Sequence, residues 1–174
     1  MTKLTINKYA AKKISQGIAV LDARDFPGNS YTEGFADLYF EHQFVSKAYF
    51  SRQNKGIGWT VTSTDFSQLL TDAKNKRKTY AQDSSTTAYR IFNQDGDGFG
   101  GMTIDIYGDY ALFSWYNAFI YTLKDEILSA FQTVFPEILG AYEKVRFESK
   151  LPISSHIYGK VAPEKFIILE NGVK

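Results

Sequence analysis

Residues 93 to 105 read NQDGDGFGGMTID and place three acidic residues and four glycines in thirteen positions. A twelve-residue calcium loop needs oxygen ligands at positions 1, 3, 5 and 12, with glycine at position 6. Starting the loop at Asn93 places Gly98 at position 6, but position 12 is then Ile104, which has no ligand oxygen. Such a loop also needs flanking helices, whereas AYRIF and MTIDIYG on either side read as strands. The stretch is therefore predicted to be a glycine-rich turn between two strands, with no metal site.

Inside this turn, several glycines are expected at positive φ, where other side chains are strained. Asp95 and Asp97 are expected to accept backbone N–H bonds within the turn, a role that suits short carboxylates. Asp105 alternates with Ile104 and Ile106, so its side chain is expected to point away from the core.

The composition favours a β-rich chain with a buried core. The 174 residues are 44% hydrophobic and 16% aromatic, and aromatic side chains pack well across strands. The absence of cysteine excludes disulfides, thiolate metal sites and cysteine nucleophiles within this chain. No apolar stretch is long enough for a signal peptide or a membrane span, so a cytoplasmic protein without membrane contact is expected.

Charge is distributed unevenly along the chain. Residues 1–80 contain 12 Lys or Arg and 7 Asp or Glu, a net charge of +5, whereas residues 81–174 contain 8 and 12, a net charge of −4. A basic N-terminal part is typical of a surface that faces a polyanion such as RNA. Ordinary solubilising lysines are the alternative explanation.

Hydrophobic periodicity predicts two successive units. The first has a helix over 8–17 and short strands separated by turn signals, which suggests a barrel or sandwich. The second begins with a helix capped by Asp65, then has three strands, and continues with a helix whose apolar positions run from Ile120 to Val134. Further strands are predicted over 142–149 and 165–174. The Asn171-Gly172 pair at the end is a hairpin signal, which predicts that a further segment follows.

No catalytic motif is present. The sequence has no phosphate-binding loop, no dinucleotide fingerprint and no nucleophile elbow. His42 and His156, the only histidines, show no metal-ligand pattern. Pairs such as Glu143 with Glu148 could act as acid and base, but spacing alone does not single them out. No catalytic residue is therefore assigned.

Residues 89–110, YRIFNQDGDGFGGMTIDIYGDY, resemble a signature close to YRLxNGEGDGLPGLxVDxYGDY. This signature is found in S-adenosylmethionine (SAM)-dependent methyltransferases that modify large-subunit ribosomal RNA, typically at cytosine C5. The upstream residues resemble the PUA domain that precedes the signature in that family. One departure is Phe99-Gly100, where many members have Leu-Pro, and it leaves the target base in doubt.

The resemblance implies an α+β fold: a small PUA-like β-barrel in residues 1–64, followed by an α/β central domain, a β-meander plus helix, in residues 65–174. It also implies that the Rossmann methyltransferase domain is absent from this chain. SAM would then be the cofactor of the full-length protein, with none bound by this fragment. The partners would be large-subunit ribosomal RNA and the protein's own C-terminal methyltransferase domain, with a homodimer left open.

This interpretation assigns roles to two sets of residues. The expected RNA contacts are the cations of the first helix, of the turn after residue 51 and of the second helix, namely Lys8, Lys12, Lys13, Arg52, Lys55, Arg77 and Lys78. The turn expected to seat the methyltransferase domain comprises Asp95, Asp97, Gly98, Gly101 and Asp105.

Two alternatives remain open from the sequence. The chain could be a stand-alone RNA-binding or assembly module without catalytic activity. It could also be a metal-dependent hydrolase that uses Asp95, Asp97 and Asp105.

Overall fold

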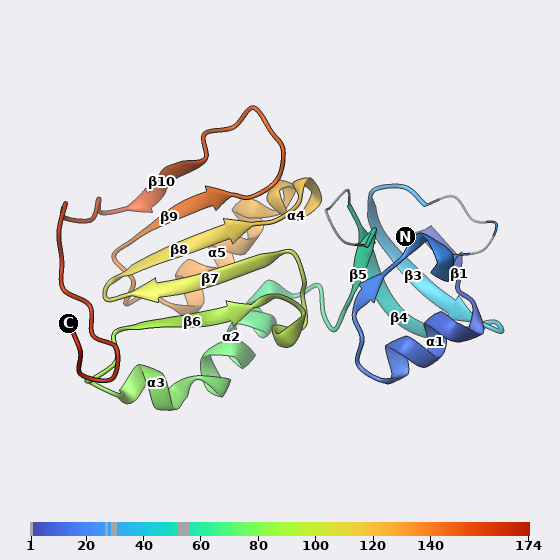
Figure 1. The fold of residues 1–174 in the computed structure, drawn as a ribbon, viewed down its shortest axis with the longest axis horizontal. Helices are drawn as coiled ribbons and strands as arrows, with labels where there is room; N and C mark the ends of the chain where they lie inside the picture. The colour runs from blue at the N-terminus through green and yellow to red at the C-terminus, as the bar shows by residue number, and fades with distance from the viewer. Residues whose placement is uncertain (1, 27, 29–30, 52–55) are drawn as a thin grey trace.

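The computed structural model describes residues 2–26, 28, 31–51 and 56–174, which form two five-stranded β-sheets placed side by side (Figure 1). The first sheet has the strand order β1-β3-β4-β5-β2, and the second has the order β10-β9-β8-β7-β6. No helix in the described part of the chain is long and apolar enough to cross a membrane.

The first sheet is mixed, because β1 runs parallel to β3 while β3, β4 and β5 form antiparallel pairs. Its elements are β1 (Thr2–Thr5), α1 (Lys8–Ser15), β2 (Val20–Leu21), the 3₁₀ turn η1 (Ala23–Asp25), β3 (Gly34–Phe40), β4 (Gln43–Phe50) and β5 (Gly58–Val61). Helix α1 packs over this sheet and contributes Ala10 to a small apolar core. Gly17 follows the helix at a φ of 82°, as the predicted C-terminal cap requires.

The second sheet begins as an antiparallel meander of β6, β7 and β8, and β9 then runs parallel to β8. Its elements are α2 (Phe66–Lys76), α3 (Lys78–Gln82), β6 (Ala88–Asn93), η2 (Gln94–Asp97), β7 (Met102–Tyr107), β8 (Tyr110–Trp115), α4 (Ala118–Thr122), α5 (Lys124–Val134), β9 (Gly140–Val145) and β10 (Ser154–Gly159). Helices α4 and α5 form the crossover that a parallel pair requires.

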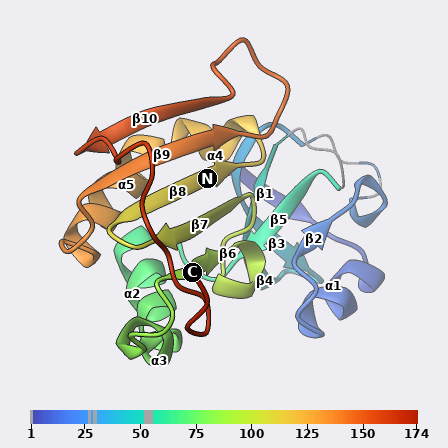
Figure 2. The same cartoon turned by 60° about the vertical axis from the view of Figure 1, so that its left-hand side comes forward.

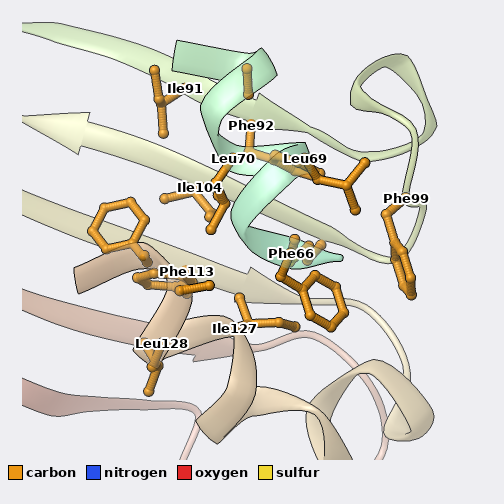
Figure 3. Close-up of a cluster of buried hydrophobic side chains, with 14 of the residues drawn as sticks. Phe66, Leu69, Leu70, Ile91, Phe92, Phe99, Ile104, Phe113, Ile127 and Leu128 are labelled. Atoms are coloured by element: carbon orange, nitrogen blue, oxygen red, sulfur yellow. The ribbon is translucent and has the colours of Figure 1, made fainter. Parts of the chain in front are cut away.

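Helices α2 and α5 cover one face of the second sheet and bury the main core. Figure 3 shows Leu70 of α2 and Ile127 of α5 directed toward Phe92, Ile104 and Phe113 of the strands. The opposite face, here called the open face, carries no helix (Figure 1). The C-terminal segment passes in front of it (Figure 2).

The structure corrects the predicted fold class. The first unit is a five-stranded mixed sheet with β1 and β2 at its edges, rather than a small β-barrel, because β1 adds in parallel beside β3. The second unit contains the predicted β-meander, in β6, β7 and β8, followed by helices. The crossover through α4 and α5 then returns β9 parallel to β8, which the prediction did not specify. Alternation along single strands does not reveal either parallel pairing.

Several local predictions are confirmed. Asp65 caps α2, because its Oδ1 accepts a hydrogen bond from the backbone N–H of Gln68 at 3.0 Å. Strands flank the glycine-rich turn on both sides, as predicted. The helix predicted over 120–134 is instead divided at Leu123 into α4 and α5.

The predicted strand over 165–174 is wrong apart from its last turn. Asn171 and Gly172 adopt φ values of 51° and 79°, and Glu170 and Val173 form an isolated bridge around them. The preceding residues lie beside the start of β6, where the backbone N–H of Thr87 donates to the carbonyl of Leu169 at 2.8 Å.

Candidate nucleic-acid interface

Helix α1 presents cations and an exposed aromatic ring on its outer side. Asn7 starts the helix, because its Oδ1 accepts from the N–H of Ala10 at 2.8 Å. Lys8 and Lys12 are four residues apart and both exposed, so they lie on the same helix face. Tyr9 beside them is 58% exposed.

The sequence interpretation missed two members of this surface. The guanidinium of Arg24 lies over the ring of Tyr9, 5.8 Å from its centroid. Arg24 also contacts Asp22 at 3.5 Å, but its side chain remains 72% exposed. The four residues Lys8, Tyr9, Lys12 and Arg24 are called the α1 surface below. The only sequence signal for this surface is the aromatic Tyr9 among the basic residues of α1. Arg24 could not be found in this way, because it belongs to η1 and reaches Tyr9 only in the fold.

Lys13, predicted as an RNA contact, is engaged within the fold rather than presented at the surface. Its side chain is buried, and its Nζ donates to the carboxylate of Asp25, which is fully buried. A second contact, to Asp22, measures 3.4 Å. Because a buried charge is tolerated only when it is paired, Lys13 holds α1 against η1 instead of facing solvent.

Arg77 is likewise engaged within the fold. Its guanidinium forms a two-pronged pair with Asp97, with Nη2 to Oδ2 at 2.6 Å and Nη1 to Oδ1 at 3.0 Å. Lys76 adds a contact to Asp97 at 3.2 Å. The pair ties the end of α2 to the glycine-rich turn, so the guanidinium of Arg77 is already occupied within the fold. Lys78 is exposed at the start of α3, and Arg52 and Lys55 lie outside the described residues.

Asp97 accepts a backbone hydrogen bond within the turn, as predicted, and it also pairs with the cations of α2 described above. Its Oδ2 accepts from the N–H of Asn93 at 2.7 Å. Burial alone raises the pKa of Asp97, but the hydrogen bonds from Arg77, Asn93 and Lys76 outweigh it and hold the pKa below its usual value. Asp95 remains exposed, and its backbone carbonyl, not its carboxylate, accepts from the N–H of Gly98.

The glycine-rich turn joins the two sheets. Gly98 and Gly101 adopt φ values of 90° and 93°, which confirms the expectation of positive φ. The Gly98 carbonyl accepts from the N–H of Thr62 at 2.9 Å, and Phe99 forms a β-bridge with Val61. The sequence hypothesis placed this turn against a separate methyltransferase domain, whereas it packs on the first sheet of the same chain.

A buried hydrogen-bond chain completes this junction. The hydroxyl of Tyr49 donates to the carbonyl of Gly100 at 2.7 Å and accepts from Nδ2 of Asn117 at 3.0 Å. The ring of Phe99 stacks on that of Tyr49 with centroids 5.1 Å apart. Tyr49 and Trp59 of the first sheet therefore belong to the core of the second.

A groove borders this junction near the end of α1. It has a volume of about 570 Å³ and lies between β4, β5 and the glycine-rich turn, with Lys47 and Thr60 among its lining residues. A second hollow of about 430 Å³, lined by Lys76 and Asp72, shares Thr62, Asp95 and Gly98 with it. The two hollows therefore adjoin one another at these three residues.

Asp105 lies on the open face, as its alternation predicted. Its carboxylate pairs with Arg90 across the strands, with Oδ1 to Nε at 2.8 Å and Oδ2 to Nη2 at 3.2 Å. Within the described residues, no group of three or more His, Asp or Glu side chains lies close enough together to hold a metal ion. Asp97 and Asp105 are each paired with an arginine instead.

Glu143 forms a buried polar cluster on the helix-covered face of β9. Its carboxylate pairs with Nζ of Lys124 at 2.9 Å and accepts from Oγ of Ser155 at 2.8 Å. Trp115 Nε1 and the Tyr121 hydroxyl donate to it at 3.0 and 3.3 Å. Because its oxygens are occupied, we interpret this carboxylate as structural, and it does not pair with the exposed Glu148.

Acidification is expected to destabilise the protein partly through Glu143. Burial raises the pKa of Glu143, but hydrogen bonds from Lys124, Ser155 and Trp115 outweigh it and keep the pKa below its usual value. Such a carboxyl stabilises the fold above its unfolded-state pKa of about 4.3 and loses this contribution as the pH falls through its folded pKa. Urea unfolding between pH 6 and pH 3 measures the effect.

Below pH 4, the stability of Glu143→Gln should fall less steeply with decreasing pH than that of the wild type. The exposed Glu148→Gln serves as the control and should retain the wild-type slope. Equal slopes for wild type and Glu143→Gln would contradict this role.

Comparisons with known proteins define a class. No protein-family model matches the chain. A structure from Streptococcus mutans, provisionally described as a SAM-dependent methyltransferase, matches with a TM-score of 0.90 and 48% identity over 99% of this chain and 47% of its own. A crystal structure provisionally described as a methyltransferase, complexed with SAH, matches with the same TM-score and identity over 99% and 46%. The fold of this chain is therefore found in proteins described as SAM-dependent methyltransferases.

Curated relatives make the class more specific. YwbD of Bacillus subtilis (strain 168), provisionally named a ribosomal RNA large subunit methyltransferase, is 34% identical over 190 residues, covering 100% of this chain and 48% of its own. Ribosomal RNA large subunit methyltransferase I of Aliivibrio fischeri (strain MJ11) is 27% identical over 174 residues, covering 92% and 42%. The chain spans about half the length of the curated relatives it matches.

These comparisons confirm the expected relationship to enzymes that methylate large-subunit ribosomal RNA, since the relatives carry that name. They also change two expectations. The prediction of a PUA-like fragment without the Rossmann methyltransferase domain is contradicted, because structures described as methyltransferases match 99% of the chain. The expectation that this chain binds no SAM conflicts with the same likeness, because one of those structures holds SAH.

Proposed function

We propose that the protein is a SAM-dependent methyltransferase of large-subunit ribosomal RNA, and that this chain binds the RNA through the α1 surface. The observation that carries the proposal is the pair of exposed lysines Lys8 and Lys12 on one helix, next to an exposed Tyr9 whose ring lies under Arg24. Lys8 and Lys12 take part in no ion pair among the described residues. Unpaired cations beside an aromatic ring suit phosphate contacts together with base or ribose packing.

The relatives' names support the substrate class, and the resemblance of residues 89–110 supports cytosine C5 as the methylated position. In this proposal, residues 1–64 dock the RNA and residues 65–174 form a second unit. SAM supplies the methyl group in the whole protein, and the cytoplasm, where ribosomal RNA is available, is the compartment in which it acts.

The proposal predicts RNA binding that weakens steeply with salt. Each phosphate contact contributes about −0.7 to −0.9 to the slope of log affinity against log salt. Replacing Lys8, Lys12 and Arg24 together with glutamine should make that slope shallower by about 2 to 3 and lower the affinity about tenfold or more at low salt. Fluorescence anisotropy with a labelled ribosomal RNA hairpin between 50 and 300 mM salt measures both quantities.

The matched control replaces the exposed Lys150, Lys160 and Lys174 with glutamine, which changes the net charge equally but away from α1. If both triple variants lose affinity equally, general charge attraction explains the binding and the α1 surface is not the site. An α1 variant with the same RNA affinity and the same salt slope as the wild type would also show that the α1 surface is not the site.

A further inference from the structure

The strand register aligns side chains in rows across the open face of the second sheet. One row crosses all five strands, because successive pairings join Arg90, Asp105, Leu112, Tyr142 and His156. Residues paired directly across strands share a face. Asp105 belongs to this row, so the row lies opposite the helices, since Ile104 and Ile106 on either side of Asp105 are in the core.

Two shorter rows flank the first. Tyr107 pairs with Tyr110 on one side, and Ser114 pairs with Lys144 on the other. Tyr107 and His156 are exposed, whereas Tyr110, Tyr142 and Lys144 are half-buried. The open face therefore presents aromatic rings across neighbouring strands, with cations and hydroxyls between them.

Contacts among these side chains hold the rings in place. The imidazole of His156 packs edge-on against the ring of Tyr142 at 5.1 Å between centroids. The C-terminal segment also fixes Tyr142 and Tyr110, because the Tyr142 hydroxyl accepts from the N–H of Ala162 at 2.8 Å and Phe166 packs on Tyr110 at 5.5 Å between centroids. Figure 2 shows this segment crossing in front of the strands. Rings ordered in advance cost less entropy when a planar ligand stacks on them.

The charges on the face suit a phosphate backbone. Arg90 neutralises Asp105 yet keeps 47% of its side chain exposed. Lys144 forms no ion pair within the described part of the chain, so its ammonium is available beside Tyr142. The exposed aliphatic side chains of this half, such as Ile153, Val161 and Ile167, lie in the loop before β10 and in the C-terminal segment, outside the rows. Leu112, in the middle of the central row, is half-buried, so the exposed part of the rows is aromatic and charged rather than the aliphatic centre that a protein partner would favour.

We propose that the open face of the second sheet binds unpaired RNA bases by stacking them on Tyr107, Tyr142 and His156, with Lys144 and Arg90 contacting the phosphates. Aromatic side chains on a β-sheet stack successive bases of single-stranded RNA in a recurrent mode of recognition. The inference rests on the proposed function for the identity of the nucleic acid, and it adds a second surface that reads single strands. The α1 surface contacts folded RNA, whereas the open face takes bases that have left a helix.

The test compares ring removal with ring retention. Fluorescein-labelled decauridine is titrated with the wild type, with Tyr107→Ser/His156→Ser, and with Tyr107→Phe/His156→Phe. Both positions are exposed, and melting followed by circular dichroism confirms that each variant is folded. Because stacking contributes about 1–3 kcal/mol per base, the serine variant should bind decauridine about tenfold or more weakly. The phenylalanine variant should remain within about twofold of the wild type.

A second measurement does not depend on mutation. Ultraviolet cross-linking of a 5-iodouridine decamer, followed by mass spectrometry, should place cross-links on Tyr107, Tyr142 or His156. Cross-links confined to the α1 surface, or an unchanged affinity of the serine variant, would overturn the proposal. So would sedimentation showing that a second copy of the chain covers the face and that the serine variant releases it.

Failure here is distinguishable from failure of the proposed function. If the ribosomal RNA hairpin binds through the α1 surface but decauridine binding does not depend on the rings, only this inference falls. If the hairpin does not bind and decauridine binds in a ring-dependent way, base stacking on the open face is supported and RNA binding by the α1 surface is rejected. If the wild type binds neither RNA, both fall.

Discussion

Gly101→Ala is expected to destabilise the protein by about 3 kcal/mol or more. The residue adopts a φ of 93°, which costs a non-glycine residue about 1–3 kcal/mol. An added Cβ would also lie 2.3 Å from the hydroxyl of Tyr49 and 2.6 Å from Nδ2 of Asn117. Overpacking of this kind adds about 1–3 kcal/mol, and it disrupts the hydrogen-bond chain between the sheets.

Gly96→Ala in the same turn is the matched control. A Cβ there meets only Nδ2 of Asn93, at 3.7 Å, so its effect should stay within about 0.5 kcal/mol of the wild type. Urea denaturation followed by tryptophan fluorescence gives both free energies of unfolding, since Trp59 lies at the junction. Equal stabilities for the two variants would show that the junction adapts to the methyl group.

Asp97→Asn is expected to cost about 2–3 kcal/mol, although the amide keeps the shape of the carboxylate. The substitution preserves an acceptor for the N–H of Asn93, but it leaves Arg77 without its two-pronged partner in a largely buried position. Hydrogen bonds to charged groups contribute about 1.5–3 kcal/mol each. The cost cannot be read from the turn alone, because the arginine comes from α2.

Asp95→Asn, two residues away and exposed, is the control and should change stability by less than about 0.5 kcal/mol. Lowering the pH toward 3 should reduce the difference between wild type and Asp97→Asn, because the pKa of Asp97 is depressed in the folded state and its contribution is lost as the carboxylate is protonated. A difference that stays constant down to pH 3 would show that the lost charge is not the cause.

The sequence predicted features that depend on neighbouring residues. The Asp65 cap, the Gly17 terminus of α1 and the strands around the glycine-rich turn follow from residues within a few positions of each other. The orientation of Asp105 followed from alternation along β7. Each of these rests on local geometry that a short window of sequence contains.

Features that depend on distant partners could not be predicted in this way. Lys13 and Arg77 have the same composition signals as the exposed Lys12 and Lys78, and only the fold brings Asp25 and Asp97 to them. The strand β10 was missed because its first residues, Ser154 and Ser155, have no apolar alternation. The parallel pairing of β8 with β9 depends on the crossover, which periodicity does not specify.

The departure of Phe99-Gly100 from the Leu-Pro of the resembling signature also has a structural cause. The indole of Trp59 lies where a side chain at Gly100 would be, with ring atoms 2.5 to 2.6 Å from the position of a Cβ. Phe99 fills the space beside Tyr49 and Phe66. Trp59 therefore packs directly against the backbone of Gly100, across the junction of the two sheets. The sequence alone does not reveal this contact, because the two residues are far apart along the chain.

The junction through Tyr49, Gly100 and Asn117 also determines how far apart the two proposed RNA-binding surfaces can be. Because rings from both sheets share one core, the two sheets are held together, and the proposed α1 surface and the open face are held with them. An RNA that contacts both must present its duplex and its unpaired bases at one separation. The chain would then act as a gauge, selecting RNAs by the spacing of helix and loop as well as by their bases.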